Sequence, residues 1–184
     1  MMYLIVLLGI VGVVILWAVG TYNGLVSLRN RVEEAFSTMD VYLVKRYDLI
    51  PNLVETVKGY AKHESETLEN VIAARNSAMS ANTVEGKIEG EAQLAGTLSK
   101  LFALAEAYPD LKANTNFMDL QGQLQTMEGE IANARKYYNG VVKQYNTKCE
   151  TIPSNFIANF GGFEKAPLFV VSDEVQRDNV KVQF

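Results

Sequence analysis

The only histidine of the chain, His63, stands beside Glu64 and is the first residue to consider for chemistry. A histidine next to a carboxylate can act as a general base or as a pH sensor, because imidazole gains and loses a proton near neutral pH. A packed or surface histidine bonded to a carboxylate gives the same pattern and is more common. The pair alone therefore identifies no active site.

The sequence offers no metal site and no known catalytic motif. A di-iron centre in a helix bundle needs a Glu-x-x-His step on each of two helices, but the residue three positions before His63 is Tyr60. Cys149 is the only cysteine, which rules out a disulfide framework and a thiolate metal site. P-loop, Gly-x-Gly-x-x-Gly and HExxH motifs are missing. We predict no catalytic, cofactor-binding or metal-binding residue, and a protein that is not an enzyme.

Two polar clusters remain as sites of hydrogen bonding or contact. Arg46, Asp48 and Asn52 surround Pro51, a pattern that predicts a chain-reversing turn held by its own hydrogen bonds and ion pairs. Residues 135–139 (RKYYN) place an arginine beside two tyrosines. Such a cluster fits either an internal hydrogen-bond network or a protein-contact surface, and we favour the network.

The element that precedes these side chains is a charge-free N-terminal segment. Residues 1–20 (MMYLIVLLGIVGVVILWAVG) are apolar or small, and the first charged residue is Arg29. A helix of about 20 such residues spans the hydrocarbon core of a bilayer. Trp17 and Tyr22 stand where aromatic rings meet the headgroups. We predict a transmembrane anchor over residues 1–21.

The anchor has one alternative interpretation and one orientation to decide. Ala18-Val19-Gly20 offers a small-x-small cleavage site, but the segment lacks the basic start of a secretory signal, so we favour a retained anchor. Arg29 and Arg31 follow the segment. The positive-inside tendency then predicts a cytoplasmic body in the cell membrane, with the N-terminus outside.

The remainder of the chain predicts an all-α fold. Its 17 basic and 21 acidic residues give a net charge of −4, which excludes a typical nucleic-acid binder. Apolar residues recur at steps of three and four, and prolines interrupt them at only four positions. We predict a transmembrane helix that continues into a long antiparallel bundle of about four helices over residues 22–152. An irregular, aromatic-rich tail over residues 153–184 follows, which could lie against the bundle or the membrane surface.

The predicted helices have approximate boundaries. The first ends at a turn over residues 48–51, and Pro51 opens the second, which ends near Met79. The third ends at Tyr108, and the fourth begins with a capping residue at 114–116 and lasts until Pro153. In the fourth helix we expect an exposed Gln123 and four buried apolar residues: Leu120, Leu124, Ile131 and Tyr138.

Several segments resemble the LemA family of bacterial membrane proteins. Residues 46–64 (RYDLIPNLVETVKGYAKHE) are similar to its signature, and residues 22–26 (YNGLV) to the entry of its first helix. Residues 105–114 (AEAYPDLKAN) and 134–139 (ARKYYN) match the connection into its last long helix and a part of that helix. Phe36 stands where the family commonly has tryptophan. The resemblance covers nearly the whole chain.

The resemblance implies one membrane helix and a helical bundle but provides no catalytic residues to carry over. It associates one branch of the family with bacterial organelle membranes, and the family with membrane peptidases. We therefore predict a single-pass, membrane-anchored scaffold that binds the lipid bilayer, self-associates and recruits membrane-protein clients such as a peptidase. It would bind no cofactor and no nucleic acid. The alternatives are a small-ligand sensor or enzyme that uses His63 and Glu64, which requires a pocket, and a membrane-remodelling protein.

Overall fold

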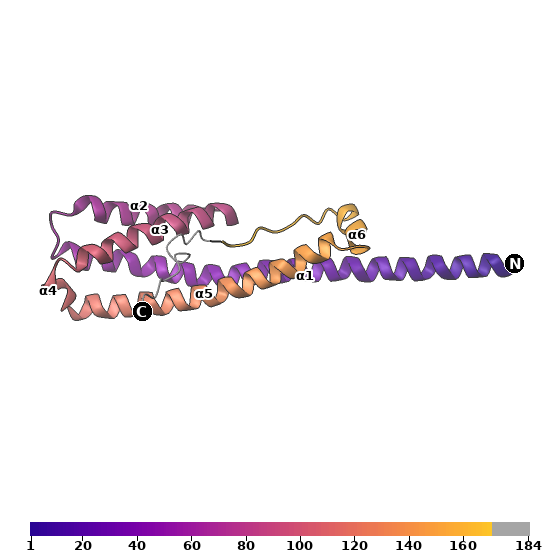
Figure 1. The fold of residues 1–184 in the computed structure, drawn as a ribbon, viewed down its shortest axis with the longest axis horizontal. Coiled ribbons are helices and arrows are strands. Elements are labelled where there is room, and N and C mark those ends of the chain that lie inside the picture. Colours follow the sequence, from indigo (N-terminus) through magenta and orange to yellow (C-terminus); the bar gives the residue numbers. More distant parts are fainter. Residues whose placement is uncertain (171–184) are drawn as a thin grey trace, which may run out of the picture. The chain divides into compact units, whose positions relative to one another are not determined.

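The computed structural model describes residues 1–170, and the predicted all-α fold is confirmed for them (Figure 1). The last part of the predicted tail, residues 171–184, lies outside the described residues. Two of the six helices, α4 and α6, are short and were not predicted. The helices are α1 (Met2–Lys58), α2 (Ser65–Ser80), α3 (Val84–Ala105), α4 (Pro109–Lys112), α5 (Thr115–Glu150) and α6 (Ser154–Phe160).

The chain divides into two compact units. Unit 1 comprises residues 1–40 and 132–168, and unit 2 comprises residues 41–131 together with Phe169 and Val170. Helices α1 and α5 each contribute to both units, whereas α2, α3 and α4 belong to unit 2 and α6 belongs to unit 1.

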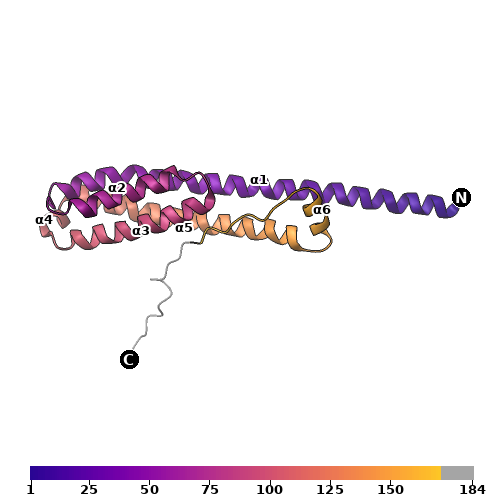
Figure 2. The same cartoon turned by 90° about the horizontal axis from the view of Figure 1, so that it is seen from above.

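In unit 2, α2 and α3 form a tightly packed helical hairpin (Figure 2). A Cβ atom added at Gly90 would lie 2.6 Å from Cα of Ala78, so that only glycine allows the two backbones this approach. Thr83 caps α3 by accepting a 3.0 Å hydrogen bond from the Gly86 amide. Asn114 caps α5 in the same way, through a 3.0 Å bond from the Phe117 amide, which confirms the predicted start of this helix.

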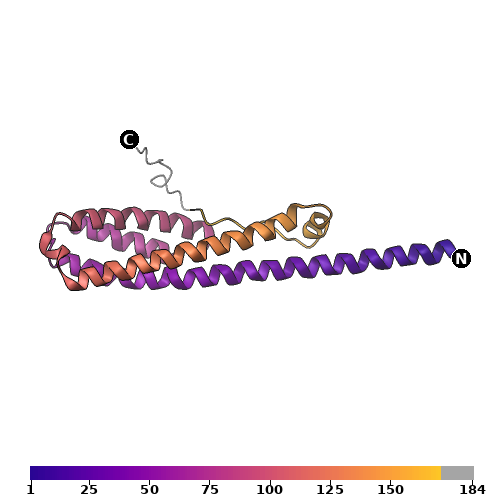
Figure 3. The ribbon, with the colours of Figure 1, turned by 60° about the horizontal axis from the view of Figure 1, so that its bottom comes forward.

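In unit 1, the segment after α6 returns along α5 (Figure 3). Aromatic contacts and hydrogen bonds to the backbone connect α1, α5 and this segment. The rings of Phe36 and Tyr138 meet edge to face, with centroids 5.8 Å apart. Tyr138 also donates to the Pro167 carbonyl over 2.9 Å. Asn146 forms two 2.9 Å hydrogen bonds with the backbone of Ala166. These bonds fix the extended residues that follow α6 against α5.

The predicted turn at Pro51 is wrong, because α1 continues through this proline to Lys58. A proline inside a helix leaves the carbonyl four residues earlier without its helical partner. That carbonyl belongs to Tyr47, and it accepts a 2.8 Å hydrogen bond from Nε of Arg75 in α2. The chain reverses instead over residues 59–64, and α2 begins at Ser65 rather than at Pro51.

The burial predicted for the fourth helix holds for most of its positions in α5. Leu124, Ile131 and Tyr138 are buried, and Gln123 is exposed. Leu120 is only half-buried, which corrects the prediction at this position.

Candidate functional site

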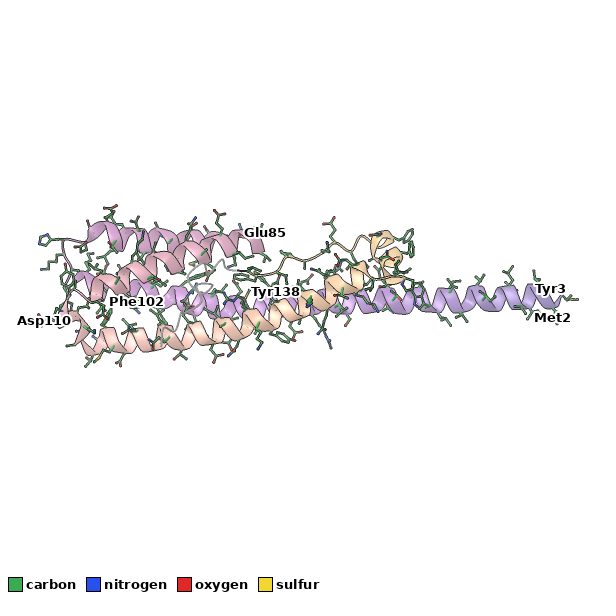
Figure 4. All side chains as sticks on the ribbon, in the orientation of Figure 1. Met2, Tyr3, Glu85, Phe102, Asp110 and Tyr138 are labelled. Carbon is green, nitrogen blue, oxygen red and sulfur yellow. The ribbon has the colours of Figure 1, made fainter. Side chains whose placement is uncertain are left out.

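The most unusual surface of the structure is the apolar N-terminal part of α1. Its large apolar side chains are exposed, from Met2 and Tyr3 at the start of the helix to Leu16, which is 74% exposed (Figure 4). None of the most apolar stretch is buried, and its length and composition suffice to cross a membrane. A core helix of a soluble domain would bury such a surface. This surface is the best candidate functional site in the described residues.

The side chains of α1 become buried from the last turn of this segment onward. Ala18 is half-buried, Thr21 is 7% exposed and Leu25 is fully buried. The ring of Phe163 packs edge to face on Tyr22, with centroids 5.3 Å apart. Packing within unit 1 therefore begins at the last turn of the apolar segment.

Unit 2 contains a buried ion pair that the sequence did not predict. Arg46 is 3% exposed, and its Nη2 atom pairs with Oε2 of Glu91, which is 4% exposed. The Nη1 atom of Arg46 lies 2.6 Å from Oε1 of Glu128, whose side chain is 53% exposed. Tyr47 donates its phenol hydrogen to Glu91 as well. The network joins α1, α3 and α5 in the interior of unit 2.

This network is better suited to holding helices than to catalysis. Arginine stays protonated in proteins, and the carboxylate of Glu91 is engaged by both Arg46 and Tyr47. In residues 1–170, no group of three His, Cys, Asp or Glu side chains is arranged to hold a metal ion. One signal could have revealed Glu91, because it lies three and seven residues before the buried Leu94 and Leu98, on the apolar face of α3.

The structure does not build a pocket around His63. Its side chain is exposed in the connection between α1 and α2, and it lines none of the four grooves found in unit 2. The hydroxyl of Tyr60 accepts a 2.9 Å hydrogen bond from the side-chain amide of Asn114, which connects this segment to the start of α5. One groove, of 580 Å³, lies between α2 and α3, and Lys100 is its only charged lining residue.

The cluster at residues 135–139 separates into buried and exposed members. Tyr138 is buried and hydrogen-bonded to the segment after α6, as expected for an internal network. Tyr137 is 60% exposed, and Arg135 is half-buried. About two turns further along α5, Asn146 binds the backbone of Ala166, a role that the sequence did not indicate.

The single cysteine is buried next to a tyrosine. Burial raises the pKa of Tyr145 to about 12, and the neighbouring Cys149 adds to this rise. Burial also raises the pKa of the Cys149 thiol. Because the thiolate is the reactive form of cysteine, this residue is a poor nucleophile at neutral pH.

The comparisons with known proteins agree with the resemblance. The model of the LemA family matches residues 35–184. Protein LemA of Metamycoplasma hominis is 24% identical over 163 residues, which cover 88% of this chain and 74% of that protein. Magnetosome protein MamQ 2 of Paramagnetospirillum magneticum is 25% identical and MamQ of Magnetospirillum gryphiswaldense 22% identical, each over 80% of this chain. The matches cover 64% of both MamQ proteins, less than two thirds of their length. None of these names denotes an enzyme.

Proposed function

We propose that this chain, which belongs to the LemA family, is a single-pass membrane-anchored scaffold that self-associates and recruits other membrane proteins. The observation that carries the proposal is the exposed apolar surface of residues 2–20 of α1. No other described part of the chain covers this surface, and a bilayer would remove it from water. The proposal places the remaining residues at the membrane surface, where they contact partner proteins.

The course of α1 supports an anchor that stays attached. The small-x-small sequence Ala18-Val19-Gly20 lies inside a helix that continues without a break to Lys58. Thr21 and Leu25, directly after it, are buried in unit 1. Removal of the first residues would therefore cut through a helix whose next turn is part of a packed core.

The arrangement of polar groups supports a binding role rather than catalysis. The buried Arg46 and Glu91 of unit 2 are engaged with each other, and His63 lies exposed outside the grooves. Exposed apolar side chains such as Val41 and Val44 of α1 offer contact area for partners. A second copy of the chain and a membrane peptidase are the partners that we propose.

Membrane anchoring is tested by placing a charge in the centre of the apolar segment. Val13→Lys should make insertion less favourable by about 3 kcal/mol and release part of the protein from the membrane fraction. Deletion of residues 1–20 should release most of it. Normal membrane retention of the deletion variant would contradict the anchor.

Self-association and recruitment are tested by crosslinking in mild detergent followed by mass spectrometry. We expect crosslinks between copies of the chain and to at least one membrane protein. His63→Ala serves as the control and should change neither pattern. A monomer without a reproducible partner would refute the scaffold, and a substrate turnover that is lost in His63→Ala would refute the non-enzymatic role.

The orientation follows from Arg29 and Arg31, which favour a cytoplasmic body. A reporter that is active only outside the cytoplasm, fused after Phe184, should stay silent. Strong reporter activity would reverse the orientation and the set of available partners.

A further inference from the structure

A second charge-free segment follows α5. Residues 151–163 (TIPSNFIANFGGF) contain no Asp, Glu, Lys or Arg, and this is the longest such stretch after Arg29. It includes all of α6. Glu150, directly before it, pairs over 2.8 Å with Lys165, two residues after it.

Helix α6 buries its small side chains and exposes its large ones. Ser154 and Ala158, one turn apart, are 7% and 0% exposed. Phe156 and Phe160, also one turn apart, are 65% and 96% exposed, and Ile152 just before the helix is 78% exposed. In water, a surface helix normally places its apolar residues toward the core. This helix presents the opposite distribution.

The end of α6 keeps these rings outward. The amide of Phe163 donates to the Ala158 carbonyl over 2.9 Å, which is a Schellman closure of the helix. Gly162 has the positive φ of 67° that this closure requires. The chain therefore turns back so that Phe163 packs on Tyr22, whereas Phe160 remains in solvent.

The contacts of Phe163 fix the level of α6 along α1 within unit 1. Tyr22 comes two residues after the apolar segment, and Arg29 places its guanidinium 5.3 Å from the centre of the Phe163 ring. Trp17 is 40% exposed, less than the other large side chains of the segment. The exposed face of α6 thus lies beside the end of the helix that crosses the membrane in the proposed function.

We propose that Ile152, Phe156 and Phe160 form a second membrane contact, which inserts into the interface of the same bilayer that α1 crosses. This inference rests on the proposed function, since the apolar segment of α1 sets the level of the membrane. Phenylalanine and aliphatic side chains on one helix face suit the boundary between headgroups and acyl chains. With no charged side chain in residues 151–163, none has to be desolvated when this face enters the boundary. The contact would fix the tilt of α1 at the membrane by adding a second attachment to the same unit.

The test uses tryptophan fluorescence of the full chain in vesicles of phosphatidylcholine and phosphatidylglycerol with acyl chains brominated near the headgroups. Bromine quenches tryptophan that lies within the acyl region. Trp17 is the only tryptophan, so the unmodified chain reports on the anchor. In a Trp17→Phe background, Phe160→Trp and Phe156→Trp report on α6. Tyr137→Trp is the matched control, since it lies in α5 about 20 Å before Glu150 at 1.5 Å per residue and is also exposed.

We expect Trp17 in the unmodified chain and the reporter in both α6 variants to be quenched, and the reporter at position 137 to keep its emission. Quenching of Trp17 without quenching in either α6 variant would refute the second contact and leave the anchor intact. An unquenched Trp17 would refute the anchor and, with it, this inference. Blue-shifted emission without quenching in both α6 variants would mean that protein, such as a second copy, covers α6, and this too would overturn the inference.

Discussion

The two compact units fill their interiors with different polar chemistry. Among the described residues, unit 2 buries the charged side chains of Arg46, Lys87 and Glu91. Unit 1 buries only the neutral polar side chains of Thr21 and Ser154. The contacts of its buried Tyr138 and half-buried Asn146 with the chain after α6 are neutral hydrogen bonds to backbone groups.

The difference shows how each unit obtains a defined packing. A buried ion pair is costly to desolvate, but it tolerates few alternative arrangements once formed. In unit 2 it therefore selects one register among helices whose remaining contacts are mostly Leu, Val and Ala. Unit 1 uses edge-to-face aromatic pairs and carbonyl acceptors for the same purpose, without a buried charge next to the apolar segment.

The largest loss of stability should come from removing the buried carboxylate of unit 2. Glu91→Ala leaves the guanidinium of Arg46 without its buried partner and should destabilise unit 2 by about 3 to 5 kcal/mol. Urea denaturation gives the free energy, and hydrogen exchange should show the loss in α3 peptides. Glu128→Ala, at a half-exposed partner of the same arginine, should cost no more than about 1 kcal/mol. Equal losses in the two variants would contradict the role of burial.

Truncation of a buried apolar side chain in unit 2 tests whether apolar packing contributes as much stability as the buried ion pair. Leu124 is 3% exposed in α5, so that Leu124→Ala should cost about 2 to 5 kcal/mol by leaving a cavity. The neighbouring Gln123→Ala should stay within about 0.5 kcal/mol. Thermal or urea unfolding of both variants decides the matter. Similar curves would show that the buried face of α5 is assigned incorrectly.

Removal of a single hydroxyl tests the contribution of the uncharged hydrogen bonds in unit 1. Tyr138→Phe keeps the ring contact with Phe36 but removes the hydrogen bond to the Pro167 carbonyl, and should cost about 1 kcal/mol. Hydrogen exchange should increase in the residues after α6 and remain unchanged in α3. Tyr137→Phe is the control at an exposed position. A loss of protection in α3 would show that the two units do not respond separately.

The last effect arises in unit 1 and is absent at neutral pH, because it appears only in alkaline solution. Since the pKa of Tyr145 is raised from 10.0 to about 12, the folded state holds this proton at pH values where the unfolded chain releases it. The pKa of Cys149 is raised from 9.0 by burial as well, so the stability should fall once the pH passes about 9 and continue to fall as the pH rises toward 12. Urea denaturation at stepwise pH measures this slope. Tyr145→Phe should reduce it, and an unchanged slope in this variant would contradict the assignment to Tyr145.

Local sequence signals predicted the helices well where the determining groups lie close together in the chain. The caps at Thr83 and Asn114 are bonded to amides three residues away, and the predicted third and fourth helices correspond to α3 and α5. The turn at Pro51 failed because Arg75, from a different helix, compensates for the missing backbone bond of the proline. No local pattern contains that information.

The same distinction applies to the candidate sites. The apolar segment was evident from composition alone, because residues 1–20 contain no charged side chain on any face of the helix. The hydrogen bonds of Asn146 and Tyr138 could not be predicted, because their acceptors are the main-chain carbonyls of Ala166 and Pro167. Every residue carries such a carbonyl, so the sequence does not indicate which one is used.

The bond between Arg75 and the Tyr47 carbonyl also has a consequence for synthesis on the ribosome. The chain grows from its N-terminus, so Pro51 is made before Arg75, and Glu91 later still. Until Arg75 is available, the carbonyl of Tyr47 can be satisfied only by water, which favours a bent α1 at this point. The emerging α1 therefore attains its final course through Pro51 only when the sequence of α2 has been added, and Arg46 gains its buried partner only after that.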